Sequence, residues 1–343
     1  MKLAIKEMKK NKMRFLILGS IIFLVSFLTL SISGLANGLS QDNASVIKDL
    51  PDGHFYLNAD AEETYNLSKI DPSIQKDVLK NHADATALSI QMGFLHNAEE
   101  KQLSAAFLTA SDSPLFPKVR QGEIILDNSF KEKGVKIGDQ LTNDQLNRSL
   151  TVKGFVEKKK FSHSPVAFVN TQDYTQMYGQ KAMQMLFIPG DTTIANKDLQ
   201  TFSNKAFLKA IPSYSAEQLS LTMIIWFLIL ISGLLFAIFF YMMNVQKIGL
   251  YGILKAIGIK MTSLFAMIWT QMFVITATAL TLSALGSQLF SLLAPDGMPY
   301  HLPINVMTQL SIVFFIVGFI GATLSGLQIK KIDPLQAIQK GDM

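Results

Sequence analysis

The sequence predicts an integral membrane α-helical protein, with four transmembrane helices and one mixed α+β extracellular domain between the first and second helices. The chain is 49% hydrophobic and has a mean hydropathy of +0.28, which is too apolar for an ordinary soluble protein of 343 residues. Four runs lack Asp, Glu, Lys and Arg and are long enough to cross a bilayer. The intervening residues 41–217 have the composition of a soluble domain that is large enough to form its own core.

The distribution of lysine and arginine orients the helices. Twelve cations and only three acids occur in segments 1–14, 244–262 and 329–343, whereas residues 38–217 carry 19 cations and 22 anions. The positive-inside rule therefore places both termini and the 244–262 loop in the cytoplasm, and the 41–217 domain outside the cell membrane. The basic isoelectric point, about 9.1, reflects this orientation and indicates no nucleic-acid partner.

Residues 1–14 combine a lysine-rich sector with an apolar sector that contains Ala4, Ile5 and Met8. This pattern predicts a short interfacial helix on the inner leaflet, with its lysines drawn to anionic lipid. A signal peptide also begins with positive charge, but the uncharged run that follows is too long for the apolar core of a signal peptide. About 25 residues at 1.5 Å each span roughly 37 Å, so we expect an uncleaved transmembrane helix over 15–40.

The extracellular domain at 41–217 has a mixed pattern. Residues 122–127 predict a short strand that leads into a helix, and runs at 150–156 and 166–169 predict further strands. A polar helix is expected at 171–178. The domain is therefore expected to combine strands with short helices.

Three further uncharged runs complete the membrane part. In the last of them Gly318, Ala322 and Gly326 recur every four residues, a small-residue pattern that predicts close helix packing. A tight, proline-rich loop separates the third and fourth spans. The segments expected after the extracellular domain are spans at 218–243, 263–293 and 304–328, a cytoplasmic loop at 244–262, an outer loop at 294–303 and a cytoplasmic tail at 329–343.

The pattern of the cytoplasmic loop predicts a short helix with three distinct faces. One face is apolar, the second carries lysine and tyrosine, and the third has almost no side chain. A helix resting on lipid headgroups would use the first two faces but would leave the third without a purpose. We therefore favour a docking helix for a cytoplasmic partner. The three faces consist of Leu250, Ile253, Leu254 and Ile257, of Lys247, Tyr251 and Lys255, and of Gly249, Gly252 and Ala256.

The sequence GILKAIGIK at 252–260 resembles the cytoplasmic loop of FtsX/MacB-type ABC transporter permeases, and GEIILDNSFKEKGVKIGDQL at 122–141 is similar to the extracellular core domain of MacB-type members. The resemblance implies a coupling helix that lies in a groove of a separate cytoplasmic ATPase subunit, two copies of which would bind a homodimer of this chain. Leu250 replaces a Glu that many members carry, so any ion pair of that Glu is absent or replaced. The implied coupling residues are Lys247, Gly249, Leu250, Tyr251, Gly252, Ile253, Leu254, Lys255, Ile257 and Gly258.

Four segments in order narrow the resemblance to the HrtB subfamily of haem-efflux permeases. They are MKLAIKE at the N-terminus, ISGLANGL at 32–39, FFYMMNVQKIG at 239–249 and KIDPLQAI at 331–338. The resemblance implies haem as the substrate, and haem needs aromatic walls and one or two N, O or S ligands. The candidate residues for binding it, for each of which a core, interface or loop role is the alternative, are Tyr56, His163, Phe168, Tyr214, Met223 and Tyr241.

No catalytic constellation stands out in the sequence. The chain lacks a phosphate loop, HExxH and GxSxG, it has no cysteine, and its five histidines are scattered without metal-site spacing. The spans contain no Asp, Glu, Lys or Arg that could relay protons, which argues against a secondary transporter. We therefore expect no intrinsic cofactor, metal or enzymatic activity in this chain, and expect ATP hydrolysis on the partner subunit. Two alternatives stay open: an FtsX-like transmitter of force to an extracellular partner, and an exporter of peptides or lipids.

Overall fold

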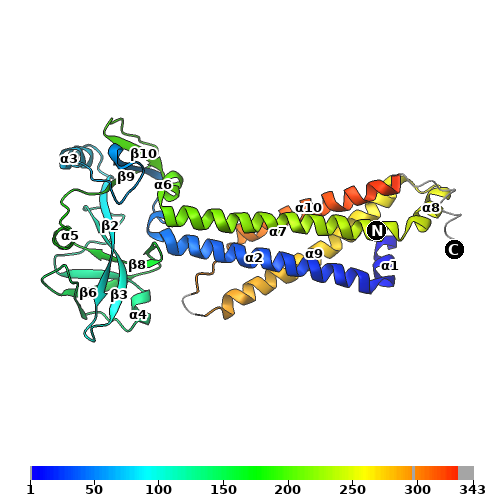
Figure 1. The fold of residues 1–343 in the computed structure, drawn as a ribbon, viewed down its shortest axis with the longest axis horizontal. Helices are drawn as coiled ribbons and strands as arrows, with labels where there is room; N and C mark the ends of the chain where they lie inside the picture. The colour runs from blue at the N-terminus through cyan, green and yellow to red at the C-terminus, as the bar shows by residue number, and fades with distance from the viewer. Residues whose placement is uncertain (1, 296–297, 331–343) are drawn as a thin grey trace. The chain divides into compact units, whose positions relative to one another are not determined.

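The computed structural model describes residues 2–295 and 298–330, so the tail expected at 329–343 lies outside the described residues beyond position 330. The chain divides into two compact units (Figure 1). A helical unit combines Met1–Gly38 with Ser220–Met343, and a sheet domain comprises Leu39–Leu219. Four helices are long and apolar enough to cross a membrane, and a mixed α/β domain lies between the first and second of them, which confirms the predicted fold class.

The helical unit is built from long helices joined by short ones. α2 and α7 continue beyond the spans expected at 15–40 and 218–243, because their polar ends belong to the sheet domain. Within the expected 244–262 loop, the nine-residue helix α8 lies between the end of α7 at Val245 and the start of α9 at Met261. The helices of this part of the chain are α1 (Lys2–Lys10), α2 (Lys12–Lys48), α7 (Pro212–Val245), α8 (Ile248–Ala256), α9 (Met261–Leu293) and α10 (Ile304–Lys330).

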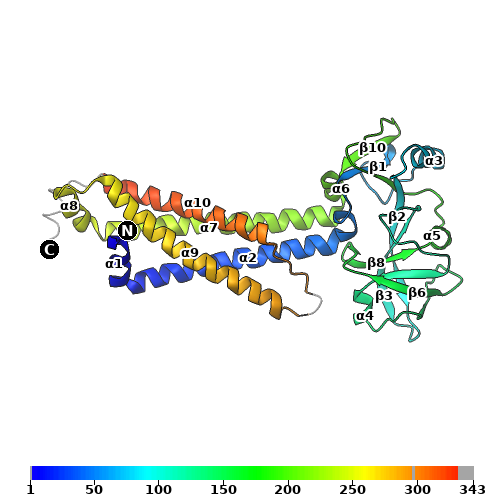
Figure 2. The ribbon, with the colours of Figure 1, turned by 180° about the vertical axis from the view of Figure 1, so that it is seen from behind.

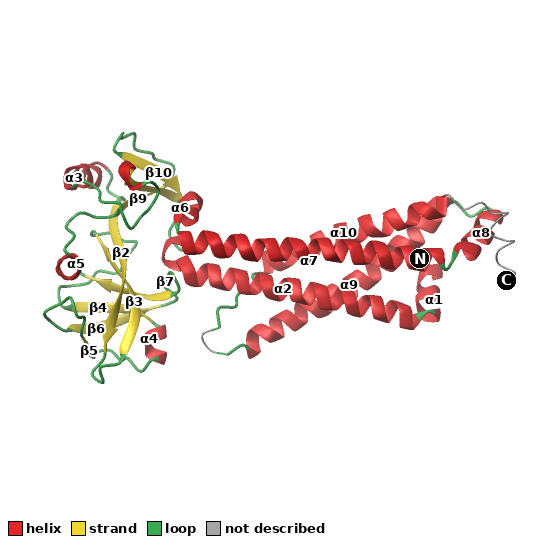
Figure 3. Ribbon diagram, in the orientation of Figure 1, coloured by secondary structure: helices red, strands yellow, loops and turns green. Residues whose placement is uncertain are grey.

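The sheet domain contains a mixed sheet whose strand order is β10-β1-β9-β2-β3-β8-β4-β6-β5, with β7 paired to β8 (Figure 3). The β3–β8 and β4–β6 pairs are parallel, and the other pairs are antiparallel. The strands are β1 (Gly53–Asn58), β2 (Thr86–His96), β3 (Gln102–Ala110), β4 (Glu123–Asp127), β5 (Gln140–Leu141), β6 (Leu150–Val156), β7 (Lys160–Phe161), β8 (Ser164–Val169), β9 (Met185–Pro189) and β10 (Leu199–Ser203). The helices are α3 (Pro72–Asn81), α4 (Ser129–Glu132), α5 (Thr171–Tyr178) and α6 (Asn204–Ala210), with a 3₁₀ turn at Ala59–Ala61.

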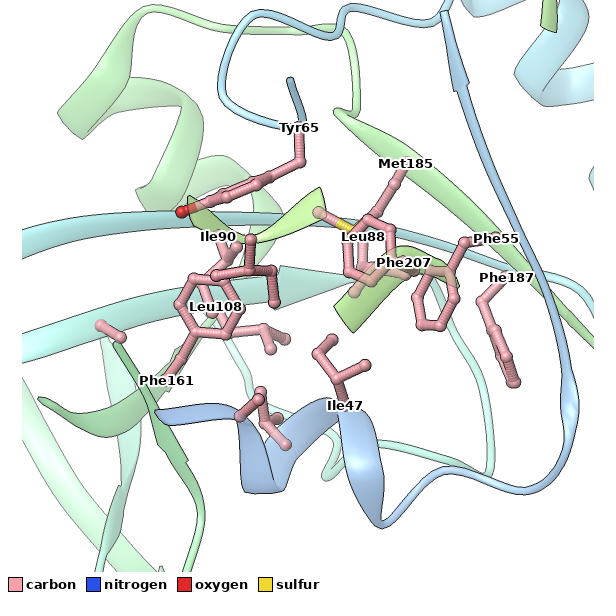
Figure 4. Close-up of a cluster of buried hydrophobic side chains, with 14 of the residues drawn as sticks. Ile47, Phe55, Tyr65, Leu88, Ile90, Leu108, Phe161, Met185, Phe187 and Phe207 are labelled. Atoms are coloured by element: carbon pink, nitrogen blue, oxygen red, sulfur yellow. The ribbon is translucent and has the colours of Figure 1, made fainter. Parts of the chain in front are cut away.

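Aromatic side chains fill the largest core of the sheet domain (Figure 4). The Phe55 ring of β1 stacks on Phe207 of α6 at a centroid distance of 4.2 Å and lies 4.8 Å from Phe187 on the neighbouring strand β9, so α6 packs on this part of the sheet. Ile47, from the end of α2, is fully buried in the same cluster. The last turns of α2 are therefore part of this domain's core, which explains why the helix continues after its apolar run ends.

A kink at Ala44 (φ −151°, ψ 28°) interrupts α2 within the sheet domain. A break in a helix leaves backbone carbonyls without their i+4 partners. The turn between β7 and β8 supplies new donors, since Ser162 N–H donates to the Asn43 carbonyl at 2.7 Å and His163 N–H donates to the Asp42 carbonyl at 3.2 Å. Both donor residues have left-handed backbone angles (φ 46° and 62°), a conformation that these contacts hold in place.

α9 is the most buried of the four candidate spans, since half of its most apolar stretch is buried, and it runs beside α10 (Figure 2). It joins α10 through the Trp269 indole, which donates to Thr323 Oγ1 at 3.0 Å. It joins α2 through a buried contact of 2.6 Å between the Ser26 and Ser283 hydroxyls. Hydrogen bonds inside apolar surroundings fix the register of both helix pairs.

Small residues allow the close helix packing predicted for the last span. A Cβ atom added at Gly321 would lie 3.0 Å from the Ala237 backbone nitrogen, and one added at Gly233 would lie 2.9 Å from a Val317 methyl group. Ala322 is fully buried beside them. Of the predicted residues, a Cβ atom at Gly318 would lie 3.2 Å from the Phe236 ring of α7, and one at Gly326 would lie 2.7 Å from the Phe265 ring of α9, so the small residues of α10 pack against both helices.

The connection from α9 to α10 packs on two glycines of α2. His301 N–H donates to the Gly34 carbonyl at 2.9 Å. A Cβ atom at Gly34 would lie 2.5 Å from the Tyr300 ring, and one at Gly38 would lie 2.0 Å from the Pro299 carbonyl oxygen. These glycines lie one helical turn apart, so they form one flat strip that admits the loop backbone.

Candidate functional site

α8 is a short helix with well-defined ends. Lys247 is the N-cap residue before its first helical position, and the Lys247 carbonyl accepts the Tyr251 N–H at 2.9 Å. Gly258, which follows the C-cap residue Ile257, has φ 85°, and the Ile259 N–H donates back to the Leu254 carbonyl at 3.0 Å. This is a glycine-terminated helix end, in which a left-handed residue closes the last turn. The second glycine of GILKAIGIK is therefore the stop signal of α8.

The outward side of α8 is apolar. Leu250, Ile253 and Ile257 are 46%, 51% and 69% exposed, respectively. Large apolar side chains exposed together on one helix face are typical of a surface that binds another molecule. This outward surface is called the apolar face of α8 below.

The inward side of α8 differs from the sequence expectation. Gly252 is buried within the helical unit, so it is not available to a partner as part of a side-chain-free face. Lys247 and Tyr251 are also buried, which leaves their side chains to internal contacts. The expected coupling residues thus separate into an exposed set (Leu250, Ile253, Ile257 and Gly258), a half-buried set (Gly249, Leu254 and Lys255) and a buried set (Lys247, Tyr251 and Gly252).

An ion pair holds the beginning of α8. The Lys247 ammonium contacts Glu7 Oε1 of α1, and both side chains are about one-tenth exposed. Glu7 Oε2 accepts a second hydrogen bond, at 2.8 Å, from Gln271 Nε2 of α9. The same ammonium lies 5.7 Å above the centre of the Phe15 ring. Lys247 therefore connects α8 directly to α1 and, through Glu7, to α9.

A second chain of hydrogen bonds holds the middle of α8. The Tyr251 hydroxyl donates to Asn244 Oδ1 at 3.0 Å, and Asn244 Nδ2 donates to the Ser325 hydroxyl at 2.6 Å. Burial raises the pKa of Tyr251, and the Glu7 charge raises it further, so the hydroxyl keeps the proton that it donates. Tyr251 thereby connects α8 to the end of α7 and to α10.

Two of the residues expected to bind substrate come together in the sheet domain. The Tyr214 hydroxyl accepts from Ser40 Oγ at 3.1 Å, at the start of α7. Asn43 lies one helical turn after Ser40, and its Nδ2 atom is 3.2 Å from His163 Nε2. The same His163 nitrogen is 2.7 Å from Glu217 Oε1. The start of α7 therefore supplies a phenol and a carboxylate three residues apart, Tyr214 and Glu217, and the β7–β8 turn supplies the His163 imidazole that contacts this carboxylate.

Two other expected substrate residues lie inside the sheet domain. Tyr56 is fully buried, and its hydroxyl accepts the Ile194 N–H at 2.9 Å. Phe168 is 3% exposed, packs at 6.2 Å from the Phe116 ring and lines a cavity of about 320 Å³. Both positions are explained by the packing of the sheet. Phe168 belongs to the core cluster against which Tyr214 packs, whereas Tyr56 belongs to a different cluster.

The remaining two expected substrate residues lie on the exposed side of α7. Met223 belongs to a stripe with Trp226, Phe227 and Leu230, all between 51% and 65% exposed. This stripe lines a groove of about 450 Å³, closed on one side by Gly233 and Val317. Tyr241 is 46% exposed but lies 18 residues after Met223, which is about 27 Å along a helix. Met223 and Tyr241 of one chain therefore do not share one binding position.

Sequence reasoning missed several residues that complete these sites. Trp226 and Phe227 follow Met223 at the helical spacing i+3 and i+4, so the stripe could have been found from the pattern. The partners of α8, Glu7, Gln271 and Ser325, come from other helices, and their proximity could not have been found. Among the described residues, no group of three or more His, Cys, Asp or Glu could hold a metal ion.

Comparison with known proteins gives matches along the whole chain. Residues 222–334 match the family described as FtsX-like permease C-terminal. A protein of Staphylococcus haemolyticus named as the hemin transport system permease HrtB is 30% identical over 357 residues, covering 98% of this chain and 99% of the relative. An HrtB protein of Staphylococcus epidermidis is 28% identical over 353 residues, covering 99% and 100%.

A solved structure also resembles part of the chain. The periplasmic region of MacB from Actinobacillus actinomycetemcomitans aligns with a TM-score of 0.35 and 11% sequence identity, covering 46% of this chain and 92% of that structure.

Proposed function

The chain belongs to the family of FtsX-like permeases that contains the HrtB proteins, and on this basis we propose that it is the membrane subunit of an ATP-driven haem exporter. Membership of this family gives the general role of the chain. It is a multi-pass permease subunit of an ABC transport system, and such a permease works with a partner ATPase. The positive-inside rule supports an orientation with α1 and α8 in the cytoplasm and the sheet domain outside. A homodimer is proposed because the described residues of one copy include four candidate spans and two ATPase subunits are expected to bind the transporter.

The observation that carries the ATPase docking proposal is the apolar face of α8. Leu250, Ile253 and Ile257 are exposed on a helix whose opposite side is fixed by an ion pair and a hydrogen-bonded tyrosine. Burying one such side chain stabilises a complex by about 1.5–3 kcal/mol. We propose that this face, rather than the buried Gly252, enters the groove of the ATPase. The half-buried Gly249, Leu254 and Lys255 would border the contact.

Ile253→Asp tests the docking proposal, because it places a charge at the centre of the apolar face without touching the buried side of α8. Loss of one buried isoleucine weakens binding roughly ten- to hundredfold, and the buried charge adds to this loss. The measurement is co-purification of the ATPase with the chain. Ile253→Leu is the control, since it keeps the apolar area. Equal ATPase recovery with both variants would refute docking through this face.

The substrate proposal is supported by the aromatic stripe on α7. Met223, Trp226 and Phe227 offer a flat, apolar and polarisable surface, which suits a planar macrocycle. Within the sheet domain, Tyr214 and His163 offer oxygen and nitrogen donors, respectively, as a separate candidate position. We propose that haem enters sideways from the bilayer along the stripe and that movement of the subunits driven by the ATPase expels it outward. Tyr56, Phe168 and Tyr241 are not required in this scheme.

Cells that lack the protein test the substrate. We expect them to become sensitive to haemin and to accumulate it in the membrane, and the double variant Trp226→Ala with Phe227→Ala should reproduce this defect. Phe273→Ala is the matched control, because Phe273 is 58% exposed on α9, away from the stripe. Normal haemin tolerance in the deletion strain, together with altered cell shape or peptide resistance, would favour the transmitter or peptide-export alternatives.

A further inference from the structure

The ion pair between Glu7 and Lys247 lies where a charged pair is costly. The two side chains are only 12% and 9% exposed, so both charges have lost most of their water. Glu7 is the only acidic residue among the first 41, a segment that carries six cations. Its carboxylate is fully engaged, since one oxygen contacts Lys247 and the other accepts from Gln271. Such a pair is retained at a cost in desolvation, which indicates a role that simple packing would not fulfil.

The pair fixes the rotation of α8. Lys247 and Tyr251 are four residues apart and therefore lie on one side of the helix. Lys247 is held by α1, and Tyr251 is held by Asn244 at the end of α7. Two directional contacts one turn apart prevent the helix from turning about its axis. The direction of the apolar face, with Ile253 at its centre, follows from this constraint.

The ion pair between Glu7 and Lys247 also joins α1 to the helix that carries the apolar face of α8. Ala4 of α1 is fully buried in the cluster that also contains Tyr251 and Leu264. The lysines of α1 at positions 6, 9 and 10 are exposed on its other side. α1 thus packs by Ala4 and Met8, contacts α8 through Glu7 and leaves its cations and Ile5 exposed. Through Glu7, α1 therefore contacts both α8 and α9.

We propose that Glu7 and Lys247 are positioning residues for energy coupling, and that α1 and α8 move as one body when the ATPase acts. This inference rests on the proposed docking of the ATPase at the apolar face of α8. Removing the pair would leave Leu250, Ile253 and Ile257 in place but would release the angle at which they are presented. Force applied to α8 would then no longer pass through Gln271 into α9.

Four variants of the full chain, purified with its ATPase, test the proposal. Glu7→Gln and Lys247→Gln each leave one buried charge without its partner, and we expect haemin-stimulated ATP hydrolysis to fall at least tenfold. Glu7→Lys combined with Lys247→Glu restores opposite charges in reversed order, and we expect at least half of the stimulation to return. If the protein required Glu7 and Lys247 each at its own position for folding alone, the exchange of the two charges would not restore the stimulation.

The fourth variant covers the case in which single substitutions fail to fold. Glu7→Leu with Lys247→Met replaces both charges by apolar groups of similar size, which is often neutral for stability. We expect this variant to reach the membrane at the wild-type level and to be at least tenfold less responsive to haemin. Wild-type stimulation in this double variant, or failure of the charge exchange to restore any stimulation, would overturn the proposal.

Ile253→Asp separates failure of the positioning pair from failure of the docking proposal. If Ile253→Asp abolishes ATPase recovery while the Glu7→Leu and Lys247→Met double variant is fully coupled, only the positioning role is refuted. If Ile253→Asp also leaves recovery unchanged, the docking proposal itself is refuted, and the positioning role is refuted with it.

Discussion

Substitution of Gly38 offers a direct test of how the helical unit is packed. A Cβ atom at this position would lie 2.0 Å from the Pro299 carbonyl oxygen, 2.3 Å from its carbon and 2.7 Å from the Tyr300 nitrogen. All three atoms belong to the backbone, so no side-chain rotation can relieve the contact. To reach an ordinary separation of about 3.4 Å, α2 or the loop after α9 must move by more than about 1 Å. Overpacking of this kind costs about 1–3 kcal/mol.

A matched control removes the effect of helix propensity from this comparison. Gly19 lies in the same helix, and a Cβ atom there would meet only a methyl group of Ile275, at 3.6 Å. Gly→Ala in a helix is intrinsically favourable by roughly 1 kcal/mol, and this gain applies at both positions. The difference between Gly19→Ala and Gly38→Ala therefore reports the overpacking cost alone. Gly34→Ala should be intermediate, since its nearest atoms belong to the Tyr300 side chain.

The assay is the thermal midpoint of each detergent-solubilised variant, measured by the loss of the folded peak in size-exclusion chromatography. A cost of about 1–3 kcal/mol corresponds to a midpoint several degrees lower for Gly38→Ala than for Gly19→Ala. Equal midpoints for the two variants would mean that the loop backbone does not lie on the glycine strip of α2. A lower midpoint for Gly19→Ala than for Gly38→Ala would refute the reasoning outright.

Two further predictions concern the sheet domain. The buried Asp127 carboxylate accepts from the Ser129 and Lys159 backbone N–H groups at 3.0 and 2.6 Å, so Asp127→Ala should destabilise the domain by about 2–4 kcal/mol, and more than Asp127→Asn, as measured by protease resistance. Hydrogen bonds from Ser73 lower the pKa of Asp71 below its ordinary value of 3.8, so the cap that Asp71 provides for α3 is fully present above that value. The protection of α3 amides, which is their exchange compared with the intrinsic rate at each pH, should therefore fall as the pH drops through the lowered pKa, and Asp71→Ala should remove this dependence.

The four spans could be predicted because the bilayer imposes a simple requirement on composition. A charge-free run of sufficient length has few alternatives to a spanning helix, and lysine flanks mark its ends. The actual helix ends could not be predicted in the same way. α2 continues to Lys48 because Ala44, Val46 and Ile47 are buried in the sheet domain, a tertiary contact that the local pattern does not contain.

The faces of α8 show what a helical pattern does and does not determine. Periodicity correctly groups Leu250, Ile253 and Ile257 but wrongly adds Leu254, which packs against the inner cluster, and it does not say which face points away from the protein. A face of small residues permits close approach by a partner and by the protein's own helices equally well. The buried position of Gly252 results from the second possibility, because polar residues beside it already have partners within the unit.

The substrate residues were the least predictable part of the molecule. Tyr214 and His163 are 51 residues apart in sequence and approach each other only because the β7–β8 turn packs on the kinked end of α2. Tyr56 and Phe168 are aromatic residues of strands, and their burial is the ordinary outcome for such residues. Only the stripe that starts at Met223 follows a local spacing, which is why its members could have been named together.

A single acidic residue within a strongly basic segment proves to be informative. The positive-inside rule accounts for the six cations of the first 14 residues, but it gives no reason for Glu7 among them. A carboxylate that merely faced water would add nothing to membrane orientation, whereas a carboxylate that points inward requires a cation from another helix. Lys247 is the first cation after α7, and it is the one that meets this requirement. An isolated charge that contradicts the sign of its surroundings is therefore a signal for a buried ion pair, although its partner can be identified only from the fold.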